Sequence, residues 1–321
     1  RSPMYHSILL EDVIDLLQIN RLATTRTLPP KLTADLKTTA EAMLRWLQLM
    51  SHPDGRISLF NDATFGIAPE IADLEGYAQV VGIELVGFKL DGLHYMESSG
   101  YAVCRRAQWC LVSDIGPIGP DYLPGHAHAD SLSFELSLSS ARLFVDSGIS
   151  TYEANDNRLF QRGTRAHNTI TVSGRNSSVV WGGFRVAQRA KPLNCYARPG
   201  SSVDVISGSH DGYFRLPTRN IHSRSWQIDD GKIRIEDRIN GGNIEAEANW
   251  HIGPEFIAET CKDGVFLRHS KLPIKAIMSF SAGTVRIEES EYHCGFGQSI
   301  RNQRISVAFD GNHLDTTIST A

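Results

Sequence analysis

Short segments that alternate apolar and polar residues recur from residue 76 to the end of the chain, and this pattern limits the possible folds most strongly. In residues 132–138, LSFELSL, a leucine or phenylalanine stands at every second position, with a serine or glutamate between. That period of two is typical of a strand with one buried face. Further segments bounded by turn residues read as strands too, among them QVVGIELVGF (79–88), YAVCRR (101–106), WCLVSD (109–114) and RLFVDSG (142–148). We therefore expect residues 76–321 to form a large antiparallel multi-sheet β-sandwich.

Residues 1–75 have a different period. Two runs of apolar residues near helical spacing are separated by Pro29 and Pro30, and the second run ends at HPDG (52–55). This spacing predicts helices that each bury one face. A chain of 321 residues has room for one large β domain and a smaller helical one. We therefore expect an α+β multidomain protein with a boundary at residue 75.

Composition argues against some classes of protein but does not determine the cellular compartment. The net charge of −4 argues against a globally basic nucleic-acid-binding protein, and no apolar stretch approaches the roughly 20 residues that cross a bilayer. The opening RSPMYHSILLEDVIDLL carries acidic residues where a signal peptide is apolar, and it lacks an initiator Met. We expect a fragment, bacterial periplasmic or secreted if a missing N-terminus carries a signal and otherwise cytoplasmic. The five cysteines are scattered, which argues against a disulfide framework and a cysteine metal site.

Polar residues gather in three motifs: GHAHAD (125–130), VDSG (145–148) and AHNT (166–169). His126 and His128 are two residues apart, which places both imidazoles on one face of an extended segment. Asp146 ends the next predicted strand, and His167 precedes another. Two histidines and a carboxylate suit Zn²⁺ or a similar ion. Polar residues that hydrogen-bond to turns at strand ends would give the same spacing, so both interpretations stay open. Asp130 is interpreted as a local structural acceptor.

Longer stretches around these motifs resemble a known family. The run from GHAHADSLSFELSL through AHNTITVSG to VVWGGFRVAQRA is similar to the C-terminal β domain of heparinase II/III-type polysaccharide lyases. The opening residues resemble the last helices of that family's (α/α) toroid. The resemblance covers most of residues 1–190 and implies the end of a toroid in residues 1–75, followed by the β-sandwich. It also implies that uronic-acid polysaccharides are cleaved by β-elimination in the cleft between the two parts.

The resemblance also implies roles for particular residues. The metal ligands fall on His128, Asp146 and His167. Zn²⁺ or another divalent ion held there would be mainly structural, because three protein ligands pin it between strands; direct polarisation of the substrate carboxylate is the alternative. The histidine that faces the cleft falls on His126. The toroid tyrosine falls on Tyr5 in SPMYH, with the neighbouring His6 as an alternative. The family's toroid residues that neutralise the substrate carboxylate would lie upstream of residue 1.

A basic block points to an anionic ligand independently of the family. Between Asp156 and Asp204 the chain has no carboxylate but eight cations. Arginine matches carboxylate and sulfate oxygens with two parallel hydrogen bonds, although part of such a block normally pairs with acids elsewhere. We expect substrate contacts from these arginines and from two aromatic residues that can stack on sugar rings: Arg162, Arg165, Arg185, Arg189, Trp181 and Tyr152.

The expected function is a lyase acting on a heparin-like, heparan-sulfate-like or alginate-like polysaccharide. A non-catalytic polysaccharide-binding or exopolysaccharide-assembly protein that keeps the metal-bound β domain is the alternative. A metal hydrolase is a weaker option, because no second carboxylate is placed like the glutamate of His-Glu-x-x-His. We expect no nucleic-acid partner and no membrane span. The oligomeric state is open, with a dimer as one option.

Overall fold

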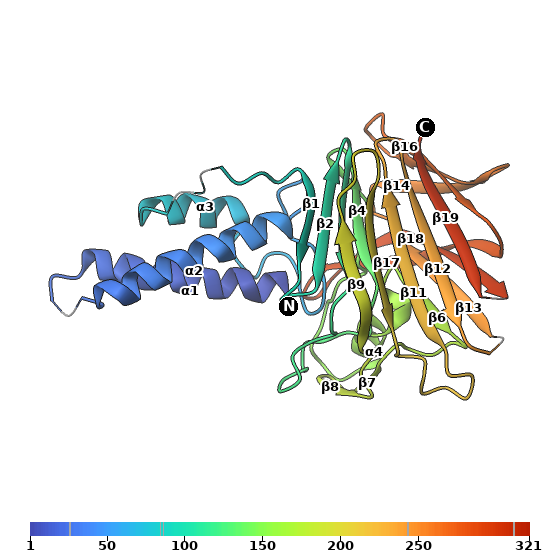
Figure 1. Cartoon of the computed structure of the whole chain (residues 1–321), viewed down its shortest axis with the longest axis horizontal. Helices are drawn as coiled ribbons and strands as arrows, with labels where there is room; N and C mark the ends of the chain where they lie inside the picture. Colours follow the sequence, from blue (N-terminus) through green and yellow to red (C-terminus); the bar gives the residue numbers. More distant parts are fainter. Residues whose placement is uncertain (26, 84, 86, 243, 311) are drawn as a thin grey trace.

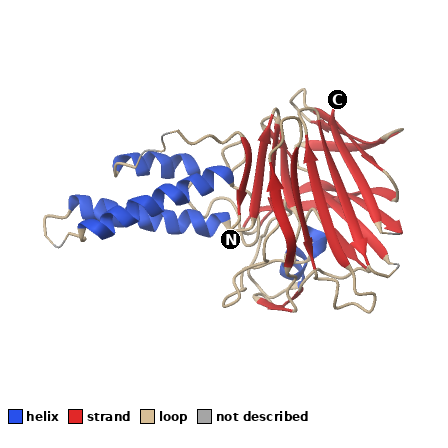
Figure 2. Ribbon diagram, in the orientation of Figure 1, coloured by secondary structure: helices blue, strands red, loops and turns tan. Residues whose placement is uncertain are grey.

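A computed structural model describes residues 1–321 except 26, 84, 86, 243 and 311. Three helices project from one side of a large body of strands (Figure 1), and the colouring by secondary structure separates the two parts (Figure 2). The helices are α1 (Pro3–Leu22), α2 (Pro30–Leu49) and α3 (Ile71–Val80). This arrangement confirms the predicted order of a helical part followed by a multi-sheet β part.

The helices share one hydrophobic core. Its buried members include Leu10 and Ile14 of α1, Leu44 of α2 and Leu74 of α3. Helix α1 begins at Pro3, where the missing backbone N–H costs nothing, and Ser2 caps it by accepting a hydrogen bond from the Tyr5 N–H. This cap fixes the first turn, which carries Tyr5.

Two sequence predictions at the end of the helical part need correction. Helix α3 runs through residue 75, so the boundary placed there cuts a helix. The segment 79–88 was predicted to be a strand, but its first two residues belong to α3 and none of its other described residues lies in a strand. Val81 and Ile83 are buried against α1 and α2, so the apolar residues of this segment complete the helical core. Residues 84 and 86 lie outside the described part.

The strands form three large antiparallel sheets and one small one. The five-stranded sheet contains β1 (Gly92–Met96), β2 (Tyr101–Arg106), β3 (Trp109–Asp114), β4 (Phe134–Leu138) and β5 (Ala141–Phe144). The eight-stranded sheet has the order β14 (Phe256–Cys261), β15 (Gly264–His269), β16 (Lys275–Phe280), β19 (His313–Thr320), β12 (Lys232–Asn240), β11 (Ile221–Ile228), β10 (Asp204–His210) and β9 (Pro192–Arg198). The four-stranded sheet has the order β17 (Thr284–Gly295), β18 (Gln298–Asp310), β13 (Glu245–His251) and β6 (Ile170–Val172). A hairpin is formed by β7 (Val179–Trp181) and β8 (Arg185–Ala187).

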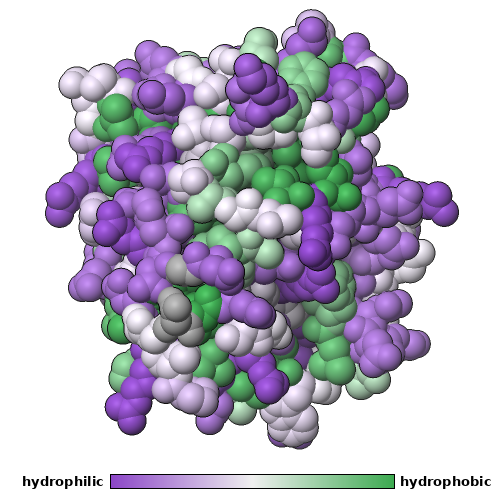
Figure 3. All heavy atoms as spheres, turned by 90° about the vertical axis from the view of Figure 1, so that its right-hand side faces the viewer, coloured by the Kyte–Doolittle hydropathy of each residue, from purple (hydrophilic) through white to green (hydrophobic). Residues whose placement is uncertain are grey.

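The main core lies between these sheets. Phe134 of β4 packs edge-on against Trp226 of β11 and Trp250 of β13, which joins the three large sheets through one aromatic cluster. On the far side of the molecule from the helices, hydrophilic side chains surround hydrophobic ones near the centre of the face (Figure 3). Such a mixture is ordinary for an exposed sheet face.

Strand β4 is buried on both faces, whereas its alternating sequence predicts one polar, solvent-exposed face. Its polar side chains face the helical part instead. Glu135 Oε2 lies 3.1 Å from Nε2 of His52, and Ser137 Oγ lies 2.7 Å from Nδ1 of the same ring. Arg142 completes this buried network by pairing with Glu135. The five-stranded sheet is therefore a middle layer, with apolar packing on one face and a hydrogen-bonded polar contact to the helical part on the other.

Two long connections carry the predicted site residues. The loop between β3 and β4 contains GHAHAD, and the segment between β5 and β6 contains Asp146, helix α4 (Asp156–Gln161), a single 3₁₀ turn (Thr164–Ala166) and His167. Within the described residues, no helix is both long enough and apolar enough to cross a membrane.

Candidate active site

Tyr5 and His126, which come from opposite parts of the fold, lie side by side. Their ring centroids are 4.7 Å apart. Tyr5 is 36% exposed on the first turn of α1, and the side chain of His126 is 42% exposed in the loop before β4. His6 points elsewhere, because its Nε2 hydrogen-bonds to the carbonyl of Met43 in α2. The structure therefore brings Tyr5, rather than His6, to the cleft histidine.

A buried carboxylate that the sequence analysis missed lies beneath both histidines of the HAH motif. Asp62 accepts a hydrogen bond from His126 Nδ1 and another from His128 Nε2, each at 2.8 Å. It also accepts a hydrogen bond from Arg158 Nη2 at 2.7 Å and one from Nη1. Burial by itself raises the pKa of Asp62, but the hydrogen bonds from His126, His128 and Arg158 outweigh it and hold the pKa far below its usual range.

The bond to Asp62 decides which nitrogen of His126 is open. An ionised carboxylate only accepts hydrogen bonds, so Nδ1 of His126 carries the proton that it shares with Asp62. In the neutral ring, Nε2 then has a free lone pair on the partly exposed side. This arrangement suits a group that removes a proton from a bound molecule.

Tyr152 joins the site through its hydroxyl group. The Tyr5 and Tyr152 hydroxyl oxygens are 3.0 Å apart, and the Tyr152 ring lies 5.9 Å from that of His126. Burial raises the pKa of Tyr152 well above its usual value, and the charge of Asp62 adds to this effect, so Tyr152 stays protonated. Its ring contacts Phe184 and Phe296 edge-on. Tyr152 is thus part of the site, and its ring is largely used for packing.

A cavity of about 200 Å³ opens beside these residues. Tyr5 and His126 line it together with residues of the loop that follows β3, including Tyr122 and Leu123. Tyr122 is 88% exposed and Leu123 is 63% exposed. Large exposed side chains beside a mainly apolar cavity that contains a few polar groups are typical of a surface that contacts a ligand.

The predicted metal ligands are neighbours, and two of their nitrogens have no partner. His128 and His167 have ring centroids 5.3 Å apart, and His167 Nδ1 donates to Asp146 Oδ2 at 2.7 Å. His128 Nδ1 and His167 Nε2 are buried, and no described group hydrogen-bonds to either. Burial lowers the pKa of His128 to about 3, which keeps its ring neutral. The donor types therefore fit a divalent metal, although the three ligand atoms do not converge to within 4.8 Å of one another.

Asp130 does not act as the local acceptor that the sequence suggested. Its side chain is fully buried, and neither carboxylate oxygen receives a hydrogen bond from the described residues. Burial, together with the nearby charge of Asp114, raises the pKa of Asp130 to about 7. The GHAHAD loop therefore places an unpartnered acid next to the two histidines.

Arg162 is buried and holds the histidine loop, which corrects its assignment as a substrate contact. Its Nη2 donates to the carbonyl of Ala127, between the two histidines, at 2.9 Å, and its Nη1 donates to the carbonyl of Gly182 at 3.2 Å. Its own carbonyl accepts a hydrogen bond from the Ala129 N–H. The basic block was predicted to bind the anionic groups of a substrate, whereas the guanidinium of Arg162 donates to backbone carbonyls instead.

The other predicted substrate contacts are not gathered around His126. Arg165 forms a 3.4 Å ion pair with Glu247, and Arg189 pairs with Asp121 at 3.1 Å. Arg185 lies over the exposed ring of Trp181 in the β7–β8 hairpin. Phe184, at the turn of this hairpin, lies 5.8 Å from the His126 ring. Of these predicted contacts, Arg185 and Trp181 belong to the β7–β8 hairpin, which extends to the His126 site.

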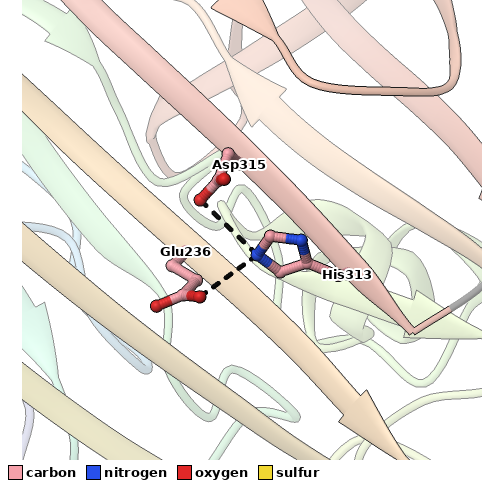
Figure 4. A group of neighbouring side chains, drawn as sticks. All are labelled: Glu236, His313 and Asp315. Carbon is pink, nitrogen blue, oxygen red and sulfur yellow. Dashed lines mark hydrogen bonds and ion pairs between the residues drawn. The ribbon is translucent and has the colours of Figure 1, made fainter.

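One group of described residues does bring three ligand atoms within 4.8 Å, namely Glu236, His313 and Asp315 on adjacent strands β12 and β19 (Figure 4). Both carboxylates already have guanidinium partners, because Arg238 binds Glu236 and Arg234 binds Asp315. A cation here would have to displace these arginines. The group is therefore explained as an exposed ion-pair network.

Comparisons with known proteins identify the fold and the family. Residues 89–321 match the family described as heparinase II/III-like, C-terminal. The heparan sulfate lyase HepC from Pedobacter heparinus has the same fold, with a TM-score of 0.76, 16% sequence identity and coverage of 99% of this chain and 52% of that one. A heparinase III structure gives a TM-score of 0.76 at 17% identity, with coverage of 100% and 53%.

The chain thus spans about half the length of these solved structures. No curated protein matches the sequence significantly. Because the family match covers residues 89–321, which is well over half of the chain, the chain belongs to the heparinase II/III-like family through its C-terminal β domain.

Proposed function

We propose that the protein is a polysaccharide lyase that cleaves an anionic, uronate-containing polysaccharide by β-elimination, with His126 and Tyr5 as the acid–base pair. The contact between their rings carries this proposal, because it places a nitrogen lone pair and a hydroxyl group on the wall of one cavity. Residues from both the helical part and the β part line this cavity, Tyr5 from the first and His126 from the second. General acid–base groups of this kind each contribute about 10²- to 10⁴-fold to a rate.

The chemistry assigns one step to each residue. Nε2 of His126 accepts the C5 proton of the uronate, and the electron pair of the C5–H bond forms the C4=C5 double bond. The bond between C4 and the glycosidic oxygen breaks, and that oxygen takes a proton from the Tyr5 hydroxyl group. The 3.0 Å contact with the Tyr152 hydroxyl orients the Tyr5 hydroxyl for this transfer.

The β7–β8 hairpin supports the proposed substrate class. Arg185 is exposed beside the exposed face of Trp181, and the hairpin turn reaches His126 through Phe184. A guanidinium next to an aromatic face suits a sugar that carries a carboxylate or a sulfate. Heparan-sulfate-like and alginate-like chains both offer these groups, and a sugar on the hairpin would lie beside the sugar that reacts.

A divalent metal, Zn²⁺ or a similar ion, is part of the proposal. His128, Asp146 and His167 would hold it, and the two unpartnered imidazole nitrogens support this assignment. When bound, the ion would cross-link the GHAHAD loop to the segments after β5 and before β6, which steadies the loop that carries His126. Elemental analysis of the purified protein should find about one such ion per chain, and His167→Ala should remove it. A wild-type protein without a transition metal would rule the assignment out.

The experiment for the main proposal incubates the full-length protein with heparan sulfate, heparin, hyaluronan and alginate. Formation of the C4=C5 double bond is followed by its ultraviolet absorbance. We expect an increase with at least one uronate polymer and none with a neutral polysaccharide such as dextran. Binding to these polymers without any increase in absorbance would favour the non-catalytic alternative.

A further inference from the structure

The carboxylate of Asp62 lies where three separate segments meet. It is fully buried in the connection between α2 and α3. Its Oδ2 accepts hydrogen bonds from His126 and Arg158, and its Oδ1 accepts hydrogen bonds from His128 and the same guanidinium. Two donors for each oxygen saturate the carboxylate, so its orientation is fixed from all sides.

The backbone of Asp62 bonds directly to His126 and is linked through Ser2 to the helix turn that carries Tyr5. Its N–H donates to the carbonyl of His126 at 3.3 Å. Its carbonyl accepts a hydrogen bond of 2.7 Å from the Ser2 hydroxyl group, which also caps the helix turn that carries Tyr5. The same residue therefore ties α1 to the histidine loop.

Arg158 keeps this arrangement electrically balanced. Its guanidinium is fully buried and pairs with both oxygens of Asp62. A buried carboxylate without such a partner is strongly destabilising, whereas a saturated pair is tolerated. With the charge balanced by Arg158, Asp62 can accept an N–H hydrogen bond from each histidine while both imidazole rings remain neutral.

We infer that Asp62 is a positioning residue that holds His126 in the tautomer with the proton on Nδ1, so that Nε2 faces the cavity as the proton acceptor. This inference rests on the proposed role of His126. Without the carboxylate, the neutral ring can place its proton on either nitrogen and can turn about its side-chain bonds. In both cases the lone pair leaves the position that the C5 proton approaches.

A tautomer measurement tests the inference without relying on activity. The full-length protein is labelled with ¹⁵N-histidine, and proton–nitrogen correlations of the imidazole rings are recorded at a pH at which the rings are neutral. The signals of His126 are identified by their loss in His126→Ala. We expect the wild type to show the Nδ1–H form, and Asp62→Asn to show a mixture or the Nε2–H form. An Nε2–H tautomer in the wild type would overturn the inference.

Kinetics provide the second readout. In Asp62→Asn we expect kcat to fall by about 10²- to 10⁴-fold, as expected when a histidine base loses the carboxylate that sets its tautomer, while KM stays within about threefold. If the single variant does not fold, Asp62→Asn combined with Arg158→Gln removes both buried charges and is measured instead. An unchanged kcat together with an unchanged tautomer would contradict the inference. An inactive wild type that shows the Nδ1–H form would reject the lyase proposal and leave the role of Asp62 in orienting the ring supported.

Discussion

The rings of Tyr5 and His126 lie 4.7 Å apart, one on the first turn of a helix and the other in a loop between two strands. Neither element could place both groups alone. The contact depends on Ser2, whose hydroxyl group is bonded to Asp62, and on Asp62, whose carboxylate is bonded to His126. The proposed chemistry is therefore a consequence of how the helical part is fastened to the β part.

Arg158→Met should destabilise the protein strongly. The change leaves the buried carboxylate of Asp62 without its guanidinium partner, and breaking a buried pair in this way costs about 3–5 kcal/mol of unfolding free energy. Urea unfolding followed by circular dichroism measures the loss. Arg185→Met is the matched control, because Arg185 is exposed and the same change there should stay within about 0.5 kcal/mol. Equal losses in the two variants would show that the pair with Asp62 is not important for stability.

Tyr122→Ala should weaken substrate binding without affecting the fold. Tyr122 is 88% exposed at the edge of the cavity, so its removal leaves no void. Loss of one aromatic contact of about 0.5–1.5 kcal/mol raises KM by about 2- to 10-fold, with kcat little changed. Steady-state kinetics on the preferred polymer measure the effect, and Phe214→Ala, at another exposed aromatic residue, serves as the control. A fall in kcat at constant KM would instead place Tyr122 in the reaction itself.

Stability should decrease on mild acidification because of buried histidines such as His251. Burial lowers the pKa of His251 to about 3, and its Nε2–H donates to the carbonyl of Arg165 at 2.9 Å. In the unfolded chain a histidine takes up a proton near pH 6.5, so below that pH the unfolded state binds more protons than the folded one. The stability from this group is complete above about pH 6.5 and is lost as the pH falls toward 3.

The variant His251→Gln isolates this contribution, because the amide can still donate a hydrogen bond. Urea unfolding at pH 7 and pH 5 should show that the wild type loses about 2 kcal/mol more than the variant. Identical losses would mean that His251 is not kept neutral by burial.

The sequence alone was enough to single out the candidate site residues that lie in recognisable motifs. Tyr5, His126, His128, Asp146 and His167 were all assigned through the resemblance, and the structure brings them together in two adjacent groups. The multi-sheet β part was predicted from alternation, because the period of two is a local property of a strand.

The residues that the sequence failed to identify, or assigned wrongly, are those whose surroundings are formed by segments distant in the chain. Asp62 stands in ISLFNDATFG with no periodic or motif signal, and only the fold shows that two histidines and an arginine surround it. A lone Asn–Asp pair within an apolar stretch was the available hint. Arg162 was predicted to contact the substrate because arginine matches carboxylate and sulfate oxygens, yet its side chain is buried and donates to backbone carbonyls of a distant loop. Likewise, the apolar residues after residue 79 are buried as predicted, but they pack in the core of the helical part and not in a sheet.

The most direct measurement is the rate of C4=C5 double-bond formation by the full-length wild type, His126→Ala and His313→Ala on the preferred uronate polymer. The two histidine side chains are equally exposed, at 42% and 43%, and each lies beside a carboxylate, so His313 is a matched control. We predict that His126→Ala lowers the rate by at least about 10²-fold while circular dichroism shows that the variant is still folded, and that His313→Ala leaves the rate at the wild-type level. A rate in His126→Ala equal to that of the wild type would contradict the account.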